Sequence, residues 1–305
     1  MRNVVLLSTS YSGSTLVSML VSSHPHVIGF GDTYNYQFVT LGKTRCTCGA
    51  VPSVACPVRT GIESRMRAMG EDFSWLTSNP TPLPRLLRSS RIATTISRSD
   101  RWLPFYRALP QTARQRLLGG YYRENAKFFE ALAQSGPYTH YFDGCKSLFR
   151  LELMRSLFPD TLVVHLIKNP KAYLHSFLTR EEMRYQSVID YWLKYHDESR
   201  RFAELLGQGN YMLVTFEELT RYPEQSLREL YRFIGVPERD EPFEQWINLK
   251  TVHVVGSGTK NQYRRVEEKA PRWKSELTRE QLTYIDRRIA QVPWLEPILP
   301  RLDWA

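Results

Sequence analysis

The chain has 305 residues, of which 42% are hydrophobic and 24% are charged, and these proportions argue against a disordered chain or a coiled coil. The formal net charge of +10 predicts acidic partners, but it does not distinguish a nucleic acid, an anionic membrane, a sulfated glycan and a polyphosphorylated nucleotide. No apolar run approaches the roughly 18 residues of a membrane-spanning helix, so we expect a cytoplasmic protein without a membrane span.

Short apolar runs alternate with longer amphipathic stretches, a pattern that predicts βαβ units and a central, mainly parallel sheet. The expected strands are residues 4–8, 138–143, 162–167 and 211–215. The helices that follow them are expected to begin near residue 15, to cover 151–158, to begin after 170 and to cover 224–234. Prolines and arginines in the stretch from about 60 to 135 predict a helical insertion. We therefore predict an α/β fold in a single domain over residues 1–305.

The first expected strand is followed by Ser8-Thr9-Ser10-Tyr11-Ser12-Gly13-Ser14-Thr15. Small residues let the backbone turn tightly, so several N–H groups can converge on a phosphate at the N-terminus of the next helix. The hydroxyls of Ser12, Ser14 and Thr15 add further donors. The Gly-Lys-Ser/Thr ending of the nucleoside-triphosphatase loop is absent. Taken alone, the segment fits an ordinary strand-to-helix turn about as well as a phosphate site.

A second strand-to-helix junction carries a cation and a hydroxyl. Lys168 follows the expected strand 162–167, and Ser176 lies eight residues later on the expected helix. These two side chains can grip one phosphate between them. In isolation, a helix that opens at Pro170 and buries a small residue at Ser176 is the simpler interpretation.

Three of the four cysteines, Cys46, Cys48 and Cys56, lie within eleven residues of one another. In a reducing compartment such a cluster indicates a metal site more than a disulfide. However, Cys-x-Cys is not the usual Cys-x-x-Cys zinc spacing, and the sequence shows no evident fourth ligand. The cysteine cluster therefore has three interpretations: a zinc site, a local disulfide, or free thiols in an ordered loop.

Together the two phosphate segments resemble the family of sulfotransferases that use 3′-phosphoadenosine 5′-phosphosulfate (PAPS). Two later segments are similar to the same family: the run Val214-Thr215-Phe216-Glu217-Glu218-Leu219, and His253-Val254-Val255-Gly256 followed by Lys260-Asn261. The resemblance implies a three-layer, P-loop nucleotide-kinase-like fold, PAPS as donor and 3′-phosphoadenosine 5′-phosphate (PAP) as product. The donor-binding residues that it implies are Tyr11, Ser12, Gly13, Ser14, Thr15, Lys168, Ser176, Phe216, Lys260 and Asn261.

Within the family, the chain most resembles the tyrosylprotein and carbohydrate branches. Asp32, in Gly31-Asp32-Thr33, matches the position of their catalytic base, and Lys146, in Gly144-Cys145-Lys146-Ser147, matches the cation beside the transferred group. Without the resemblance, a turn aspartate and a surface lysine are the ordinary interpretations. The implied acceptor is a hydroxyl, or as second choice an amine, of a small molecule or carbohydrate. Neither a metal in catalysis nor a nucleic-acid partner is implied.

The chain departs from the family pattern at three donor positions. Tyr11 stands where a Lys or Arg usually precedes Ser-Gly, Lys168 replaces an arginine, and Phe216 replaces a tyrosine near adenine. The neutral Tyr11 leaves a noncatalytic PAPS-binding or sulfated-glycan-binding protein as an alternative. A nucleotide or phosphate-ester kinase is the other alternative, against which the missing Gly-Lys-Ser/Thr element argues.

Overall fold

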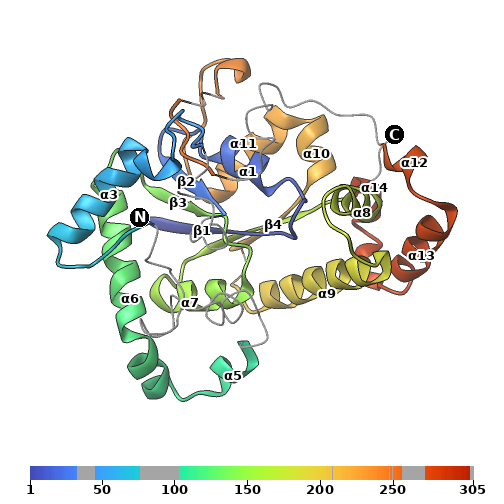
Figure 1. Ribbon diagram of the computed structural model, residues 1–305, viewed down its shortest axis with the longest axis horizontal. Helices are drawn as coiled ribbons and strands as arrows, with labels where there is room; N and C mark the ends of the chain where they lie inside the picture. The colour runs from blue at the N-terminus through green and yellow to red at the C-terminus, as the bar shows by residue number, and fades with distance from the viewer. Residues whose placement is uncertain are drawn as a thin grey trace. The chain divides into compact units, whose positions relative to one another are not determined.

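The computed structural model describes residues 1–32, 45–75, 103–207, 209–246, 248, 250–255 and 272–302, with the side chain of residue 117 left out (Figure 1). The chain forms two compact units. Unit 1 comprises Met1–Leu6, Thr15–Leu162 and Arg239–Gln262, and unit 2 comprises Leu7–Ser14, Val163–Glu238 and Tyr263–Ala305. The single domain over residues 1–305 stays a prediction.

Three parallel strands run through unit 1 in the order β2-β3-β1, where β1 is Arg2–Leu7, β2 is Val27–Gly31 and β3 is His140–Asp143. His140 pairs with Arg2 on one side and with Val27 on the other. Every residue of β2 and β3 is buried. The sequence analysis did not predict β2, because two glycines interrupt its short apolar run and glycine is depleted in strands.

The described helices of unit 1 are α1 (Ser14–Val21), α3 (Pro57–Ala68), α5 (Leu103–Ala108), α6 (Gln111–Ala133) and α7 (Leu148–Leu157). Short 3₁₀ helices cover Ser53–Ala55 and Phe243–Gln245. Helices α3, α5 and α6 fall in or beside the stretch where a helical insertion was predicted, and α3 packs against α6. Thus the described part of this stretch is largely helical.

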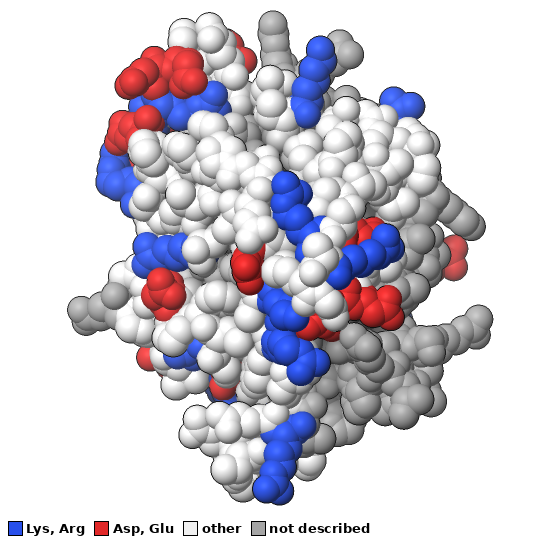
Figure 2. Space-filling view, turned by 90° about the vertical axis from the view of Figure 1, so that its left-hand side faces the viewer, with Lys and Arg blue, Asp and Glu red and all other residues white. Residues whose placement is uncertain are grey.

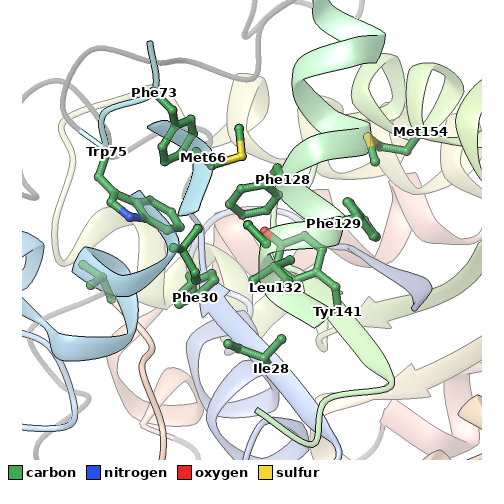
Figure 3. Packing of buried hydrophobic residues seen from close by; sticks show 13 residues of the cluster. Ile28, Phe30, Met66, Phe73, Trp75, Phe128, Phe129, Leu132, Tyr141 and Met154 are labelled. Atoms are coloured by element: carbon green, nitrogen blue, oxygen red, sulfur yellow. The ribbon is translucent and has the colours of Figure 1, made fainter. Parts of the chain in front are cut away.

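An aromatic cluster forms the core between these helices and the strands (Figure 3). Phe30 of β2 lies edge-on to Trp75, with ring centroids 4.9 Å apart, and Tyr141 of β3 meets Phe129 of α6 at 5.4 Å. Burying such rings stabilises a fold by about 1.5–3 kcal/mol each, and edge-to-face contacts add to this. The cluster therefore anchors β2 directly before Asp32.

Unit 2 contains the parallel pair β4 (Leu162–Ile167) and β5 (Tyr211–Thr215). Its helices are α8 (Pro170–Leu178), α9 (Tyr185–Glu204), α10 (Phe216–Arg221), α11 (Pro223–Ile234), α12 (Trp273–Glu276), α13 (Arg279–Ile289) and α14 (Leu299–Leu302), and a 3₁₀ helix covers Pro293–Leu295. Helix α8 packs against α9 and α13. The buried apolar core of this unit includes Trp192. The helix predicted after residue 170 is therefore two helices, because the polar segment 179–184 interrupts it.

All the strand pairings within the two units are parallel, and helices accompany the strands in both, as the α/β prediction requires. Among the described helices, none has both the length and the apolar character to cross a bilayer. On the face shown in Figure 2, Lys and Arg side chains lie beside Asp and Glu side chains. Surface ion pairs of the chain include Arg228 with Glu224 and Arg301 with Glu218.

Candidate donor-binding and catalytic residues

The loop between β1 and α1 contains two residues with positive φ, Tyr11 at 63° and Gly13 at 88°. Thr9 and Ser12 are fully buried, and their hydroxyl oxygens lie 2.6 Å apart. A Cβ at position 13 would lie 2.3 Å from two ring carbons of Phe216. Only glycine therefore fits both the backbone conformation and the space at this point of the loop.

Lys168 and Ser176 meet in unit 2, as their spacing predicted. The Lys168 Nζ donates a hydrogen bond of 2.8 Å to the Ser176 Oγ, and the Lys168 side chain also lies over the Phe216 ring, 5.1 Å from its centroid. Burial lowers the pKa of Lys168 from its ordinary value to about 8, although the nearby Glu217 opposes this and the charge of Arg180 adds to it. A buried ammonium with so few counter-charges is suited to receive an anion.

Local capping explains how the β4–α8 junction presents Lys168. Asn169 caps α8, and its Oδ1 accepts hydrogen bonds from the backbone N–H groups of Lys171 and Ala172. The backbone N–H of Asn169 donates to the Glu217 Oε1 at 3.0 Å, so the start of α10 is tied to the same junction. Because a helix N-terminus carries partial positive charge, the junction favours an anion beside Lys168.

A cation that the sequence did not indicate lies beside Tyr11. The Arg180 guanidinium stands over the Tyr11 ring, 5.4 Å from the centroid, and its Nη1 donates to the Ser176 carbonyl oxygen at 2.7 Å. The Tyr11 hydroxyl donates to the Glu181 Oε1 at 2.5 Å. Arg180 therefore brings positive charge to the loop position where the sequence has an uncharged phenol. Its place in the sequence, just after α8, carries no signal of this role.

The two predicted catalytic residues pair in unit 1. The Lys146 Nζ lies 3.1 Å from the Asp32 Oδ2, and both side chains are largely buried. Lys146 adopts a positive φ of 59°, a backbone conformation that is unfavourable for residues other than glycine. Gly144 permits the close approach, since a Cβ there would lie 2.8 Å from the Gly31 carbonyl. The end of β2 and the end of β3 thus present a carboxylate and an ammonium together.

A buried ion pair supports the turn that carries Lys146. The Arg150 Nε donates to the Asp143 Oδ2 at 2.7 Å, while the other Asp143 oxygen accepts from the Cys145 backbone N–H at 3.1 Å. Burial is the largest single influence and acts to lower the pKa of Arg150, but the charge of Asp143 together with the neighbouring tyrosine and cysteine groups raises it well above its ordinary value. The guanidinium also donates to the Tyr121 hydroxyl at 2.7 Å. These contacts hold both ends of the turn.

The remaining predicted donor residues are partly outside the described chain. Lys260 and Asn261 fall in the stretch 256–271, which the structure does not describe. Ser14 begins α1 and is buried, and Thr15 is the second residue of that helix. Unit 2 therefore holds the loop Ser8–Ser14, the Lys168–Ser176 pair, Phe216 and Arg180, while unit 1 holds the Asp32–Lys146 pair.

The sulfotransferase family model matches residues 48–241, which is more than half of the 305 residues. The chain belongs to the sulfotransferase family. The resemblance to PAPS-dependent sulfotransferases that the four sequence segments indicated is thereby confirmed.

Two curated relatives and one solved structure illustrate the relationship. Carbohydrate sulfotransferase 3 of Homo sapiens is 29% identical over 143 residues, which cover 38% of this sulfotransferase and 29% of that protein. Carbohydrate sulfotransferase 5 of Homo sapiens is 24% identical over 297 residues, covering 84% of this chain but 66% of the relative. The sulfotransferase domain of the Synechococcus PCC 7002 olefin synthase is similar with a TM-score of 0.54 and 16% identity, over 94% of each chain. At that identity the likeness concerns the fold, and it confirms the α/β, P-loop-like class.

Proposed function

We propose that this sulfotransferase transfers a sulfuryl group from PAPS to a hydroxyl of a small-molecule or carbohydrate acceptor and releases PAP. The hydrogen-bonded pair of the buried Lys168 and the half-buried Ser176 is the observation that carries the proposal. A lysine with a pKa lowered to about 8 is held with a hydroxyl beside its ammonium group, which suits a phosphate oxyanion. We assign the donor's 3′-phosphate to this pair.

The Ser8–Ser14 loop is assigned to the donor's 5′-phosphosulfate. Its backbone turns through two residues of positive φ, and Arg180 and the hydroxyl of Ser12 lie at the same loop. Convergent N–H groups and a cation stabilise the charge that grows on the leaving phosphate during transfer. Arg180 thus supplies the charge that Tyr11 lacks, which favours a catalyst over a noncatalytic PAPS-binding protein.

Asp32 and Lys146 are assigned to the chemical step. The Asp32 carboxylate accepts the proton of the attacking hydroxyl, and the Lys146 ammonium stabilises developing negative charge. The ion pair of 3.1 Å sets the orientation of both groups before an acceptor binds. The relatives named carbohydrate sulfotransferases favour a sugar hydroxyl as acceptor. The proposed compartment is the cytoplasm.

The donor assignment is tested by comparing two nucleotides that differ in the 3′-phosphate. Calorimetry measures PAP and adenosine 5′-monophosphate binding to the wild type, Lys168→Met, Ser176→Ala and the control Lys171→Met. Lys171 lies three residues after Lys168, in the first turn of α8, but pairs with Asp286. Because hydrogen bonds to charged groups contribute about 1.5–3 kcal/mol, Lys168→Met should weaken PAP binding about 10- to 150-fold. Adenosine 5′-monophosphate binding should not change, and the control should bind both nucleotides normally.

Transfer itself is measured by incubating the protein with labelled PAPS and a panel of saccharide, phenol and amine acceptors. Label should appear in at least one hydroxyl-bearing acceptor. Tight PAP binding without transfer to any acceptor would indicate a noncatalytic binding protein. Magnesium-dependent ATP turnover without PAP binding would indicate a kinase. If Lys168→Met weakens both nucleotides equally, the 3′-phosphate does not bind at Lys168.

A further inference from the structure

Four metal-ligating side chains converge in unit 1, and none of them is assigned above to the donor or the chemical step. The ligand atoms of Cys46, Cys48, Cys56 and His253 all lie within 4.8 Å of one another. Cys46 and Cys56 are fully buried, and Cys48 and His253 are half-buried. The histidine comes from a segment about 200 residues later in the chain, so the sequence pattern around the cysteines could not reveal it. We propose that these four residues bind a structural zinc ion.

The distances within the cluster match a tetrahedral zinc site better than a disulfide. The Sγ atoms of Cys48 and Cys56 lie 3.6 Å apart, and the Cys56 Sγ lies 3.2 Å from the His253 Nδ1. With Zn–S bonds of about 2.3 Å and Zn–N bonds of about 2.0 Å, tetrahedral geometry separates two sulfurs by about 3.8 Å and a sulfur from a nitrogen by about 3.5 Å. A disulfide would bring two sulfurs to about 2.05 Å.

The backbone holds this arrangement through its own hydrogen bonds. The Gly49 N–H donates to the Cys46 carbonyl oxygen at 3.0 Å, which closes the turn between Cys46 and Cys48. Thr47 connects this turn to the histidine segment, because its N–H donates to the Val254 carbonyl at 3.2 Å and its Oγ1 accepts from the Val254 N–H at 3.0 Å. The ligands are therefore placed in advance of metal binding.

A buried guanidinium is the second, independent observation. Arg59 is fully buried between the rings of Phe30 and Trp75, with its Cζ 4.6 and 4.7 Å from their centroids. Its Nη2 donates to the His253 carbonyl oxygen at 3.0 Å, and the guanidinium also lies within hydrogen-bonding reach of the Cys46 side chain, while no carboxylate is among its partners in the described part of the chain. A buried charge without a counter-charge costs several kcal/mol. Arg59 interacts electrostatically with Cys46 and Cys56.

Zinc coordination supplies the missing negative charge. When Zn²⁺ binds, the three thiols lose their protons to solvent and the histidine ligates as neutral imidazole, so the site carries a net charge of about −1. Three neutral thiols, or a disulfide with one thiol, would leave Arg59 without a counter-charge. The buried arginine therefore favours a cluster with net negative charge, which three zinc-bound thiolates supply.

The ion is structural, since four protein ligands leave no open position for a substrate or water. It joins the turn at Cys46–Gly49 to the segment that continues into Val255. The Val255 N–H donates to the Phe30 carbonyl at 3.0 Å, and Val255 bridges to Gly31, the residue before Asp32. Zinc thus stabilises the chain beside the end of β2. The inference does not depend on the proposed donor or acceptor.

Metal content tests the site directly. The full chain, purified with reductant and without added metal, should contain about one zinc per chain by mass spectrometry of the elements. Replacing zinc with cobalt should produce sulfur-to-cobalt charge-transfer bands and the intense visible bands of tetrahedral coordination. In Cys48→Ser, zinc affinity should fall more than about 100-fold, because even residues outside the ligand set change affinity about 10- to 100-fold.

Two matched variants make the result specific. Cys145→Ser removes the one cysteine outside the cluster and should keep the zinc. His253→Cys should also keep zinc but shift the cobalt bands toward those of a four-sulfur site, and this variant remains informative if Cys48→Ser does not fold. The proposal is overturned if the folded wild type binds neither metal, if its mass shows a disulfide among these cysteines, or if His253→Cys leaves the cobalt spectrum unchanged.

Discussion

The lowered pKa of Lys168 predicts that donor affinity falls in mildly alkaline solution. Only the protonated amine can neutralise a phosphate, and burial lowers its pKa to about 8. The protonated fraction then falls from about nine tenths at pH 7 to about one tenth at pH 9. Since the apparent dissociation constant varies inversely with the competent fraction, PAP should bind about tenfold more weakly at pH 9 than at pH 7.

In the ligand-free protein, the contribution of Lys168 to stability should change with pH in the opposite direction to donor affinity. The folded state holds the Lys168 proton more weakly than the unfolded chain, whose lysine pKa is 10.5. Between pH 8 and 10.5, the unfolded chain therefore binds a proton that the folded chain lacks, and the contribution of Lys168 to the free energy of unfolding rises with pH. Alkaline pH thus weakens donor binding while relieving the cost of burying this charge.

The assay is calorimetry of PAP binding from pH 7 to 9.5, a range in which phosphates with a second pKa of about 6 no longer change charge. Lys168→Arg serves as the control, because a guanidinium stays protonated throughout and its affinity should be flat with pH. Two results would refute the reasoning: a flat wild-type profile, or a Lys168→Arg profile that falls as steeply as that of the wild type.

Three further predictions follow from the packing and the ion pairs. Asp32→Asn should slow transfer about 10²- to 10⁴-fold in single-turnover measurements while PAP affinity changes less than about twofold, and unchanged transfer would remove Asp32 as the base. Gly13→Ala should lower the free energy of unfolding, measured in urea, by at least about 1–3 kcal/mol, because alanine is strained at this positive φ. Adding Phe216→Ala should remove the clash of the new Cβ with the Phe216 ring, which would otherwise lie 2.3 Å away, but should leave the cost of the backbone strain. Arg150→Met leaves Asp143 buried without its partner and should cost about 3–5 kcal/mol in the same assay; a loss below about 1 kcal/mol would show that the pair is not what stabilises the turn.

Local sequence patterns were sufficient to predict several secondary-structure elements and one side-chain contact. The strands at 162–167 and 211–215 were predicted with their observed bounds, because each is an uninterrupted run of strand-forming residues with polar segments on either side. The pairing of Lys168 with Ser176 was also predicted, from a cation at the end of a strand and a hydroxyl on the helix that follows it.

Other features depend on contacts between segments that are distant in the sequence. Strand β2 is recognisable only because β3 pairs with it and the aromatic cluster covers it. Arg180 becomes relevant because α8 ends beside Tyr11, and His253 becomes a ligand because Thr47 binds its segment. No local pattern encodes these approaches, since each depends on how two separate elements pack.

By itself, therefore, the sequence determined the α/β class, because apolar periodicity specifies strands and helices locally. The family came from the resemblance of four segments, and the same resemblance singled out the proposed donor loop, Lys168 and Asp32. The tertiary structure alone decided which charges meet: Arg180 at the loop, Lys146 at Asp32, and Arg59 at the cysteine cluster. Charges act through space over a few ångströms, and folding rather than chain order sets those distances.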